Sequence, residues 1–172
     1  MTLTHTSFTS PLGKVCVAAN EQALCGVWFA NTHRMPEWMV GAASAPAASH
    51  KASNIQTRLL DEATRQLQAY LAVELKVFDL PLDMTWGTPF QQAVWRQLMT
   101  IPYGHTCTYA DVARAIGKPL AVRAVGTAIG RNPLSVMVPC HRVLGSNGQL
   151  GGYSGGLDRK RALLAMEQAN TD

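Results

Sequence analysis

Residues 134–143 read Leu-Ser-Val-Met-Val-Pro-Cys-His-Arg-Val. The apolar run at the start of this stretch follows an Asn-Pro pair and has strand length, so we expect a buried strand that ends near Cys140. A thiol with an ordinary pKa of about 8.5 is only a few per cent thiolate at neutral pH, although the thiolate is the nucleophile. His141 can accept the proton directly or through a water, and Arg142 adds positive charge. The stretch indicates a nucleophilic cysteine, with an inert buried cysteine beside a structural histidine as the alternative.

The composition is that of an ordinary globular chain. It has 172 residues, of which 47% are hydrophobic and 15% are charged. No apolar run approaches the roughly 20 residues that span a bilayer, and the N-terminus lacks a signal-peptide pattern, so we expect a cytoplasmic protein without membrane association. The four cysteines are scattered without metal-ligand spacing, which predicts four free thiols, no bound metal and no cofactor.

Positive charge is concentrated in the C-terminal half. Residues 1–95 hold six Lys/Arg and seven Asp/Glu, whereas residues 96–172 hold nine and four, for a net charge of +4. This asymmetry suits a polyanionic partner, with nucleic acid as the first candidate. A merely basic surface fits the charge equally well.

The N-terminal half predicts a small sheet covered by a helix. We expect strands and extended elements at 3–8, 14–18, 23–29 and 77–83. The run 23–29 is the most continuously apolar, which predicts that it is the central strand. Residues 41–53 are small and of low complexity, typical of a loop. Helical periodicity over 55–72 predicts a helix with Gln66 on its polar face.

The C-terminal half predicts a helix-turn-helix. Thr88 to Gln91 combine a Thr cap, a first-turn proline and a Gln in the capping position, so a helix begins there. Thr108 to Asp111 repeat the capping pattern for a short helix closed by Gly117, and a second helix follows over 120–130. The linker 82–87 places the domain boundary between residues 84 and 85.

The second helix of this pair has an unusual outer face. Its expected inward positions are Ala121, Ala124, Val125, Ala128 and Ile129. The other face carries Arg123, Gly126, Thr127 and Gly130 at i, i+3, i+4 and i+7. Two glycines inside a helix cost about 1 kcal/mol each relative to alanine. We therefore expect this face to approach another surface closely, with tight packing on a neighbouring helix as the alternative.

Two loops follow Cys140. Residues 145–149 predict a hairpin turn that serves as a wing, with Asn147-Gly148 suited to type I′ geometry. In residues 151–156, four glycines bracket Tyr153 and Ser154, which is typical of a backbone that comes close to a partner.

The last helix is expected from about Leu157 and places Glu167 near its end. Its first turn carries Arg159, Lys160 and Arg161, where the helix dipole favours acidic side chains. This arrangement suggests either an external anion or a solvated basic patch.

Taken together, these motifs resemble the O6-alkylguanine-DNA alkyltransferase family. The match is dense from Gly87 to Glu167 and thin in the N-terminal half, where it rests on residues 10–13 and the order of elements. It rests on Gly87-Thr-Pro-Phe-Gln91, Ile101-Pro-Tyr-Gly104, Arg123-Ala-Val-Gly126, Asn132-Pro133, Pro139-Cys-His-Arg-Val143 and Gly152-Tyr-Ser-Gly-Gly156.

The resemblance implies an α+β chain: a small N-terminal ribonuclease H-like α/β domain, 1–84, followed by a C-terminal winged helix-turn-helix alkyltransferase domain, 85–172. It also implies a suicide DNA repair methyltransferase of single turnover. Such a protein flips O6-alkylguanine out of duplex DNA and irreversibly transfers the alkyl group to its own cysteine, here Cys140. The expected partner is double-stranded DNA, contacted by a monomer in the minor groove, with O4-alkylthymine as a further candidate lesion.

The resemblance also assigns roles to individual residues. Cys140 is the nucleophile, His141 the base acting through a water, Glu167 the residue that orients the histidine, and Asn132 the support of the active-site turn. Tyr109 helps to drive the nucleotide out and protonates the departing guanine. The implied DNA-binding set is Arg123, which fills the vacated space, with Gly126, Thr127, Gly130 and Arg131. The implied base pocket consists of Tyr109, the carbonyls of Cys140 and Val143, Tyr153, and the Ser154 amide.

Some features depart from the family pattern. Arg131 stands where a small residue is expected, and it is a candidate for an extra phosphate contact. The structural zinc of some relatives is not expected. The positions that match its ligands are occupied here by Met1, Asn20 and Cys25, which do not make up that ligand set. Two other functions compete with repair: a non-catalytic protein that flags alkylated DNA, which the presence of Cys140 opposes, and a cysteine hydrolase, which leaves the helix-turn-helix unexplained.

Overall fold

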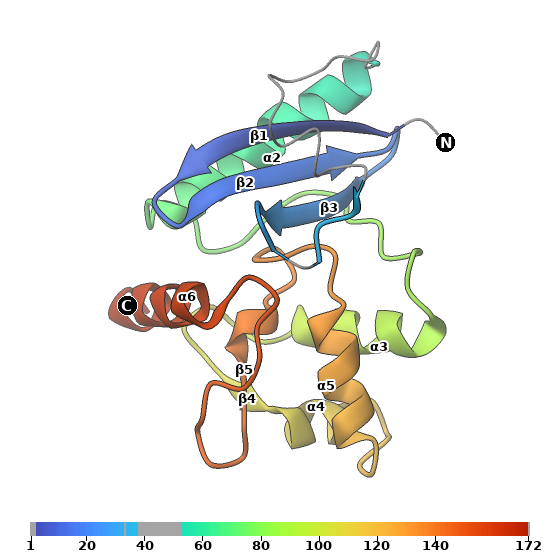
Figure 1. Ribbon diagram of the computed structural model, residues 1–172, viewed down its shortest axis with the longest axis vertical. Helices are drawn as coiled ribbons and strands as arrows, with labels where there is room; N and C mark the ends of the chain where they lie inside the picture. The colour runs from blue at the N-terminus through green and yellow to red at the C-terminus, as the bar shows by residue number, and fades with distance from the viewer. Residues whose placement is uncertain (1–2, 33, 38–52, 172) are drawn as a thin grey trace. The chain divides into compact units, whose positions relative to one another are not determined.

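The computed structural model describes residues 3–32, 34–37 and 53–171. The loop expected at 41–53 lies outside these residues, apart from Ser53. The chain forms two compact units, Met1–Asp83 and Met84–Asp172. The first is a sheet with a helix, and the second is mainly helical (Figure 1).

The first unit is a three-stranded antiparallel sheet. Its strands are β1 (Thr4–Ser10), β2 (Gly13–Ala19) and β3 (Leu24–Phe29), in the order β1-β2-β3. The prediction that the third strand is central is therefore wrong, and β2 occupies that place. The apolar sequence of β3 reflects complete burial of its residues rather than a central place in the sheet. Its outer edge is protected by a bridge to Leu82, with hydrogen bonds from Leu24 N to Pro81 O (2.9 Å) and from Asp83 N to Leu24 O (2.7 Å).

Helix α2 (Asn54–Leu71) packs along one face of this sheet (Figure 1). Ser53 caps it in a full capping box with Gln56. Gln66 was predicted on the polar face but is buried, because its amide pairs with the backbone of Asp79. The amide thus satisfies the backbone N–H and C=O of Asp79, in the segment that follows the helix.

The second unit is built around three short helices that pack on one another. They are α3 (Pro89–Leu98), α4 (Tyr109–Ala115) and α5 (Val122–Gly130). The predicted capping boxes at Thr88 and Thr108 are both present. The indole of Trp95 donates a hydrogen bond to Ala128 O (2.9 Å), which ties α3 to α5. This contact fixes the helix-turn-helix against the rest of the unit.

The remaining elements of this unit are short, apart from the last helix. The two-residue strands β4 (Cys107–Thr108) and β5 (Val143–Leu144) pair in parallel. A 3-10 turn η1 (Cys140–Arg142) precedes β5, and α6 (Leu157–Ala169) ends the unit. The expected type I′ turn is wrong: Gly148 has a positive φ of 77° but Asn147 does not, and that turn type requires both.

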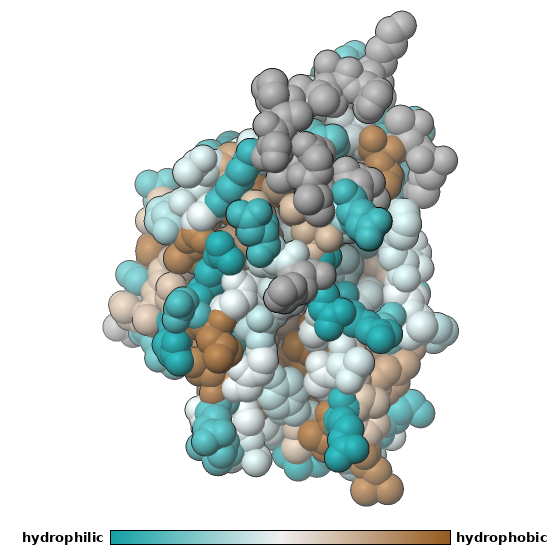
Figure 2. All heavy atoms as spheres, viewed as in Figure 1, coloured by the Kyte–Doolittle hydropathy of each residue, from teal (hydrophilic) through white to brown (hydrophobic). Residues whose placement is uncertain are grey.

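The turn between α4 and α5 exposes apolar side chains. Helix α5 begins at Val122, two residues later than predicted, because Lys118 to Ala121 form a separate turn closed by a hydrogen bond from Ala121 N to Lys118 O (2.9 Å). Leu120 is 99% exposed and Val122 is 37% exposed. Hydrophobic colour also gathers at the lower tip of Figure 2, where this turn lies in Figure 1. Over the described ranges, no helix has the length and apolar character that crossing a membrane requires.

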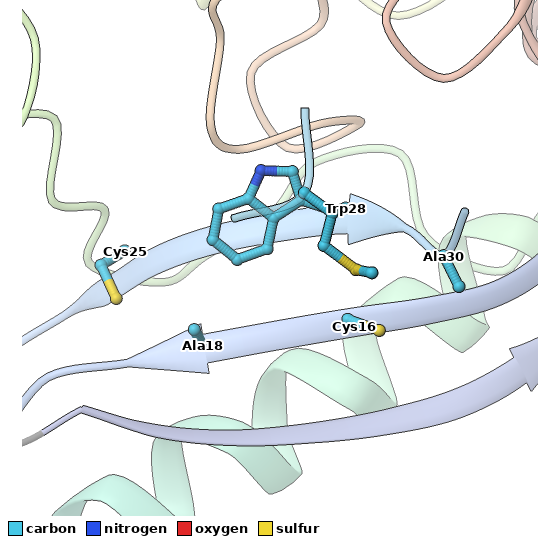
Figure 3. Packing of buried hydrophobic residues seen from close by; sticks show 6 residues of the cluster. Cys16, Ala18, Cys25, Trp28 and Ala30 are labelled. Atoms are coloured by element: carbon cyan, nitrogen blue, oxygen red, sulfur yellow. The ribbon is translucent and has the colours of Figure 1, made fainter. Parts of the chain in front are cut away.

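An apolar cluster covers the face of the sheet opposite α2. Trp28, Cys16, Ala18, Cys25 and Ala30 lie close together there (Figure 3). Gly26 makes room for the indole: a Cβ at this position would lie 1.8 Å from Cη2 of Trp28. The glycine is therefore required by packing rather than by its backbone angles.

We expect Gly26→Ala to lower the free energy of unfolding by about 1–3 kcal/mol, because the buried indole has to shift to admit the methyl group. Thermal or urea unfolding of the whole chain measures this loss. Gly152→Ala is the matched control, since a Cβ there meets no atom within 4 Å. Equal stability of the two variants would contradict the packing argument.

Candidate active site

Two tight turns, rather than a strand, deliver Cys140. The strand expected at 134–138 is wrong: this segment shows isolated bridge residues, with Ser135 bridged to Val138, instead of a strand. Val136 has a φ of +73°, and Met137 N donates to Ser135 O (2.9 Å), which makes a γ-turn of the rare, strained kind. Pro139, at φ −78° and ψ 64°, forms an inverse γ-turn in which Cys140 N donates to Val138 O (2.7 Å).

Asn132 holds this strained segment in place. Its side chain is buried and donates to Val138 O (2.9 Å) and Leu134 O (3.4 Å). Its amide oxygen accepts a hydrogen bond from Leu134 N (2.9 Å). One side chain therefore satisfies backbone groups on both sides of the turn that precedes Cys140.

The thiol of Cys140 is protonated in the resting protein. Burial raises its pKa above the ordinary value. The Asn132 side chain, the positive charge of Lys160 and the amides of Cys140 and His141 act in the opposite direction. The site thus keeps the cysteine neutral while donors and a cation surround the position of the future thiolate.

His141 is a buried, neutral base. Burial lowers its pKa, and the hydrogen bond to Glu167 opposes that shift. Nε2 lies 2.8 Å from Oε1 of Glu167, and because a carboxylate only accepts, Nε2 carries the proton. The lone pair is then on Nδ1, which is the nitrogen able to take a proton from a neighbouring group.

Glu167 is a buried carboxylate surrounded by donors. It accepts from His141, from Nε and Nη2 of Arg142 (both 2.9 Å at the shortest) and from Gly104 N (3.2 Å). Arg142 also donates to Ile101 O (2.6 Å), and its guanidinium lies 5.8 Å from the centre of the Tyr103 ring. The expectation that Arg142 activates Cys140 is therefore replaced: its charge is paired with Glu167.

Tyr109 begins α4 and lies between two glycines. A Cβ at Gly151, which has a φ of +63°, would lie 2.6 Å from the Tyr109 hydroxyl oxygen, and one at Gly126 would lie 3.7 Å from Cδ1. Burial raises the pKa of Tyr109, and the nearby Cys140 charge raises it further. The hydroxyl therefore stays protonated and can donate.

The structure divides the predicted face of α5. Arg123, Thr127 and Arg131 are exposed, whereas Gly130 is half-buried. Gly126 faces Tyr109, but a Cβ at this position would make only an ordinary contact of 3.7 Å, so packing on the neighbouring helix does not by itself require a glycine here. Ala124 was expected to face inward but is exposed, because the short helix buries only Val125, Ala128 and Ile129.

The other predicted pocket residues lie on the chain that follows η1. Val143 is buried in β5, and its carbonyl accepts from Lys160 Nζ (2.7 Å). Tyr153 and Ser154 are half-buried in the glycine-rich loop, where Gly156 N donates to Tyr153 O (3.0 Å). All four cysteines are free thiols, as predicted. Within the described part of the chain, no group of three or more His, Cys, Asp or Glu side chains could hold a metal ion.

Two family models together match nearly the whole chain. The ribonuclease-like domain of 6-O-methylguanine DNA methyltransferase matches residues 3–84, and its DNA binding domain matches residues 89–169. A methylated-DNA–protein-cysteine methyltransferase of Methanosarcina acetivorans is 45% identical over 160 residues, covering 93% of this chain and 95% of the relative. The chain belongs to the methylated-DNA–protein-cysteine methyltransferase family.

Other members of this methyltransferase family agree over similar lengths. The constitutive protein of Bacillus subtilis is 42% identical and covers 93% of this chain and 92% of the relative. The crystal structure of Mycobacterium tuberculosis OGT in complex with DNA has a TM-score of 0.80 at 40% identity, covering 96% of this chain and 93% of that one. These findings confirm the predicted family and two-domain architecture, whereas the roles of single site residues stay predictions.

Sequence reasoning missed the part that Lys160 plays in this methyltransferase. Lys160 was expected to face an external anion or solvent, but it is fully buried, and Nζ donates to the carbonyls of Val143, Leu150 and Gly152. The signal was present in the spacing: Lys160, Leu163, Leu164 and Glu167 fall at i, i+3, i+4 and i+7, the buried stripe of α6.

Replacing Asn132 tests the turn that presents Cys140. We expect Asn132→Ala to cost about 1–3 kcal/mol of unfolding free energy, because buried backbone groups lose their partners. We also expect slower reaction of Cys140 in the folded protein, measured by mass spectrometry after transfer. Asn147→Ala is the matched control, because that exposed side chain accepts one bond, from Gln149 N. If Asn132→Ala retained both stability and rate, the turn would not depend on this residue.

Proposed function

We propose that this chain is a suicide DNA repair protein that flips O6-alkylguanine out of duplex DNA and transfers the alkyl group to Cys140. The observation that carries the proposal is the buried Cys140, followed directly in sequence by a buried His141 whose Nε2 lies 2.8 Å from Oε1 of Glu167. Membership of a family whose members are named for this activity supports it. We place the protein in the cytoplasm as part of the same proposal.

The reaction balances without a cofactor. The Cys140 proton passes to Nδ1 of His141, directly or through a water, and leaves a thiolate. The thiolate attacks the alkyl carbon, so an S–C bond forms while the C–O6 bond breaks and its electron pair stays on the guanine. The Tyr109 hydroxyl protonates the guanine, and the imidazolium proton restores the tyrosine. One alkyl group moves from oxygen to sulfur.

The same chemistry explains a single turnover. A thioether has no good leaving group, so the S–C bond persists once it has formed. The protein is therefore consumed by the repair it performs.

The Glu167 carboxylate keeps His141 ready for this step. Its bond to Nε2 fixes the tautomer that puts the lone pair on Nδ1, and its negative charge stabilises the imidazolium that forms. Arg142 in turn allows the carboxylate to remain charged in a buried place.

DNA binding is supported by the OGT structure solved with DNA. We assign the contact to α5 and the residue that follows it: Arg123 and Thr127 are exposed on the helix, and the exposed Arg131 follows the small Gly130 at its end. A narrow helix face of this kind suits the minor groove, and a basic side chain there can occupy the space of a flipped base. We propose a monomer on double-stranded DNA carrying O6-alkylguanine, with O4-alkylthymine as a second candidate lesion.

The flipped base would lie among residues from three segments. Tyr109 approaches from α4, the carbonyls of Cys140 and Val143 come from η1 and β5, and Tyr153 and Ser154 come from the glycine-rich loop. The Val143 carbonyl already accepts from Lys160, but a carbonyl oxygen has two lone pairs and can accept a second bond from the base.

Intact mass and peptide mapping after incubation with a duplex bearing one O6-methylguanine test the proposal. We expect one added methyl group per protein molecule, on the peptide that contains Cys140, in step with loss of the lesion. Cys140→Ser should bind the duplex without modification. Cys107 is a half-buried free thiol, and the control variant Cys107→Ser should be methylated normally. An unmodified wild-type protein that binds the duplex would instead indicate a damage-flagging protein, and catalytic turnover of an ester would indicate a hydrolase.

Arg123→Ala tests the helix face. Because flipping costs a few kcal/mol, we expect a rate on duplex DNA about 10-fold or more lower, with little change on a single-stranded oligonucleotide. Arg131→Ala should instead weaken binding to all duplexes and reduce the salt dependence by about one counterion. Equal losses on single and double strands for Arg123→Ala would argue against a role in flipping.

A further inference from the structure

Lys160 connects three parts of the site. It is 0% exposed, and its ammonium group donates to the carbonyls of Val143 (2.7 Å), Gly152 (3.3 Å) and Leu150. Val143 is a candidate base-reading position, and Leu150 and Gly152 flank Gly151. A buried lysine that bonds one carbonyl of β5 and two carbonyls of the following loop fixes that loop relative to the strand.

The clamped loop in turn lies against Tyr109. Gly151 lies so close to the tyrosine that a Cβ would meet its hydroxyl oxygen at 2.6 Å. Because Lys160 binds the carbonyls on both sides of this glycine, it sets how close the backbone comes to the candidate proton donor. Loss of these bonds would let the loop move away from the ring.

Lys160 also acts electrostatically on the nucleophile. Its positive charge acts to lower the pKa of Cys140, and a thiolate at Cys140 in turn favours the protonated lysine. The other titratable groups around them are His141 on η1, whose pKa the Lys160 charge lowers, and Tyr109 on α4. The Arg142–Glu167 pair lies beyond His141, and Arg142 likewise lowers the pKa of His141. The positive charge that acts on the Cys140 sulfur is therefore carried by an ammonium group held on three carbonyl oxygens.

We propose that Lys160 is a positioning residue for alkyl transfer, which stabilises the Cys140 thiolate electrostatically and holds the Gly151 backbone against Tyr109. The inference rests on the proposed function and adds to it a group outside the Cys140, His141 and Glu167 set. It does not make Lys160 a catalytic residue, because the lysine acts through the thiol and the loop.

The charge of this lysine is sensitive to pH. Burial lowers the pKa of Lys160 to about 8. Its charge is present below that value and is lost as the pH rises through it. The thiolate stabilisation should therefore fade in mildly alkaline solution, even though free thiols become more reactive there.

The test is the pH dependence of the single-turnover methyl-transfer rate between pH 6 and 9.5. We expect the wild-type rate to fall above about pH 8. Lys160→Arg keeps the charge at every pH used and should lose this alkaline decline. Lys160→Gln retains a donor for the carbonyls but no charge, and its rate at pH 7.5 should be about 10-fold or more below wild type, rising with pH.

Controls separate this inference from the proposed function and from misfolding. Arg161→Gln, an exposed neighbour on α6, should reproduce the wild-type profile. Thermal unfolding and affinity for the lesion duplex identify variants that lose the fold or DNA binding. If both Lys160 variants fail to fold, the pH profile of the wild-type protein tests the inference by itself, and a wild-type rate that does not fall by pH 9.5 overturns it. A pH profile of Lys160→Gln equal to that of wild type also overturns the inference. Absence of methyl transfer by the wild-type protein contradicts the proposed function itself.

Discussion

The carboxylate of Glu167 is the constraint on which the site depends. A buried negative charge is costly unless it is paired and fully hydrogen-bonded. Here it accepts from His141, Arg142 and the Gly104 amide, which belong to η1 and to the turn after α3. The Glu167 side chain of α6 thus holds His141, Arg142 and the turn at Gly104 together. These contacts fix the orientation of the His141 ring.

The site is prepared for charge that it does not carry at rest. Burial keeps both the Cys140 thiol and the His141 imidazole neutral, since it raises the pKa of the first and lowers that of the second. Burial alone would make a thiolate–imidazolium pair very unfavourable. Asn132, two backbone amides and Lys160 face the sulfur, and Glu167 faces the imidazole, so each developing charge meets a fixed partner.

The backbone before Cys140 is strained, and neighbouring residues keep it in this conformation. A β-branched residue at positive φ, Val136, costs of order 1–3 kcal/mol, and it persists because the side chain is buried and Asn132 bonds the segment on both sides. Pro139 supplies the φ of the second turn at little cost, because its ring already restricts that angle. The chain therefore turns twice within a few residues and aims the thiol inward from a buried loop.

The sequence by itself determined the family, the order of the elements and the starts of the capped helices α3 and α4, since caps such as Thr88 and Thr108 act through neighbours a few residues away. It also indicated Cys140, His141 and Glu167 through motifs that the resemblance interprets. Tertiary structure decided the rest. β2 rather than β3 is central because strand order depends on pairing between segments. Residues 135–140 form two γ-turns in place of the predicted strand, and Asn132, whose side chain bonds Leu134 and Val138, holds them. Arg142 turns toward Glu167, and Lys160 turns inward, because buried carboxylate and carbonyl oxygens need donors that local sequence rules do not specify.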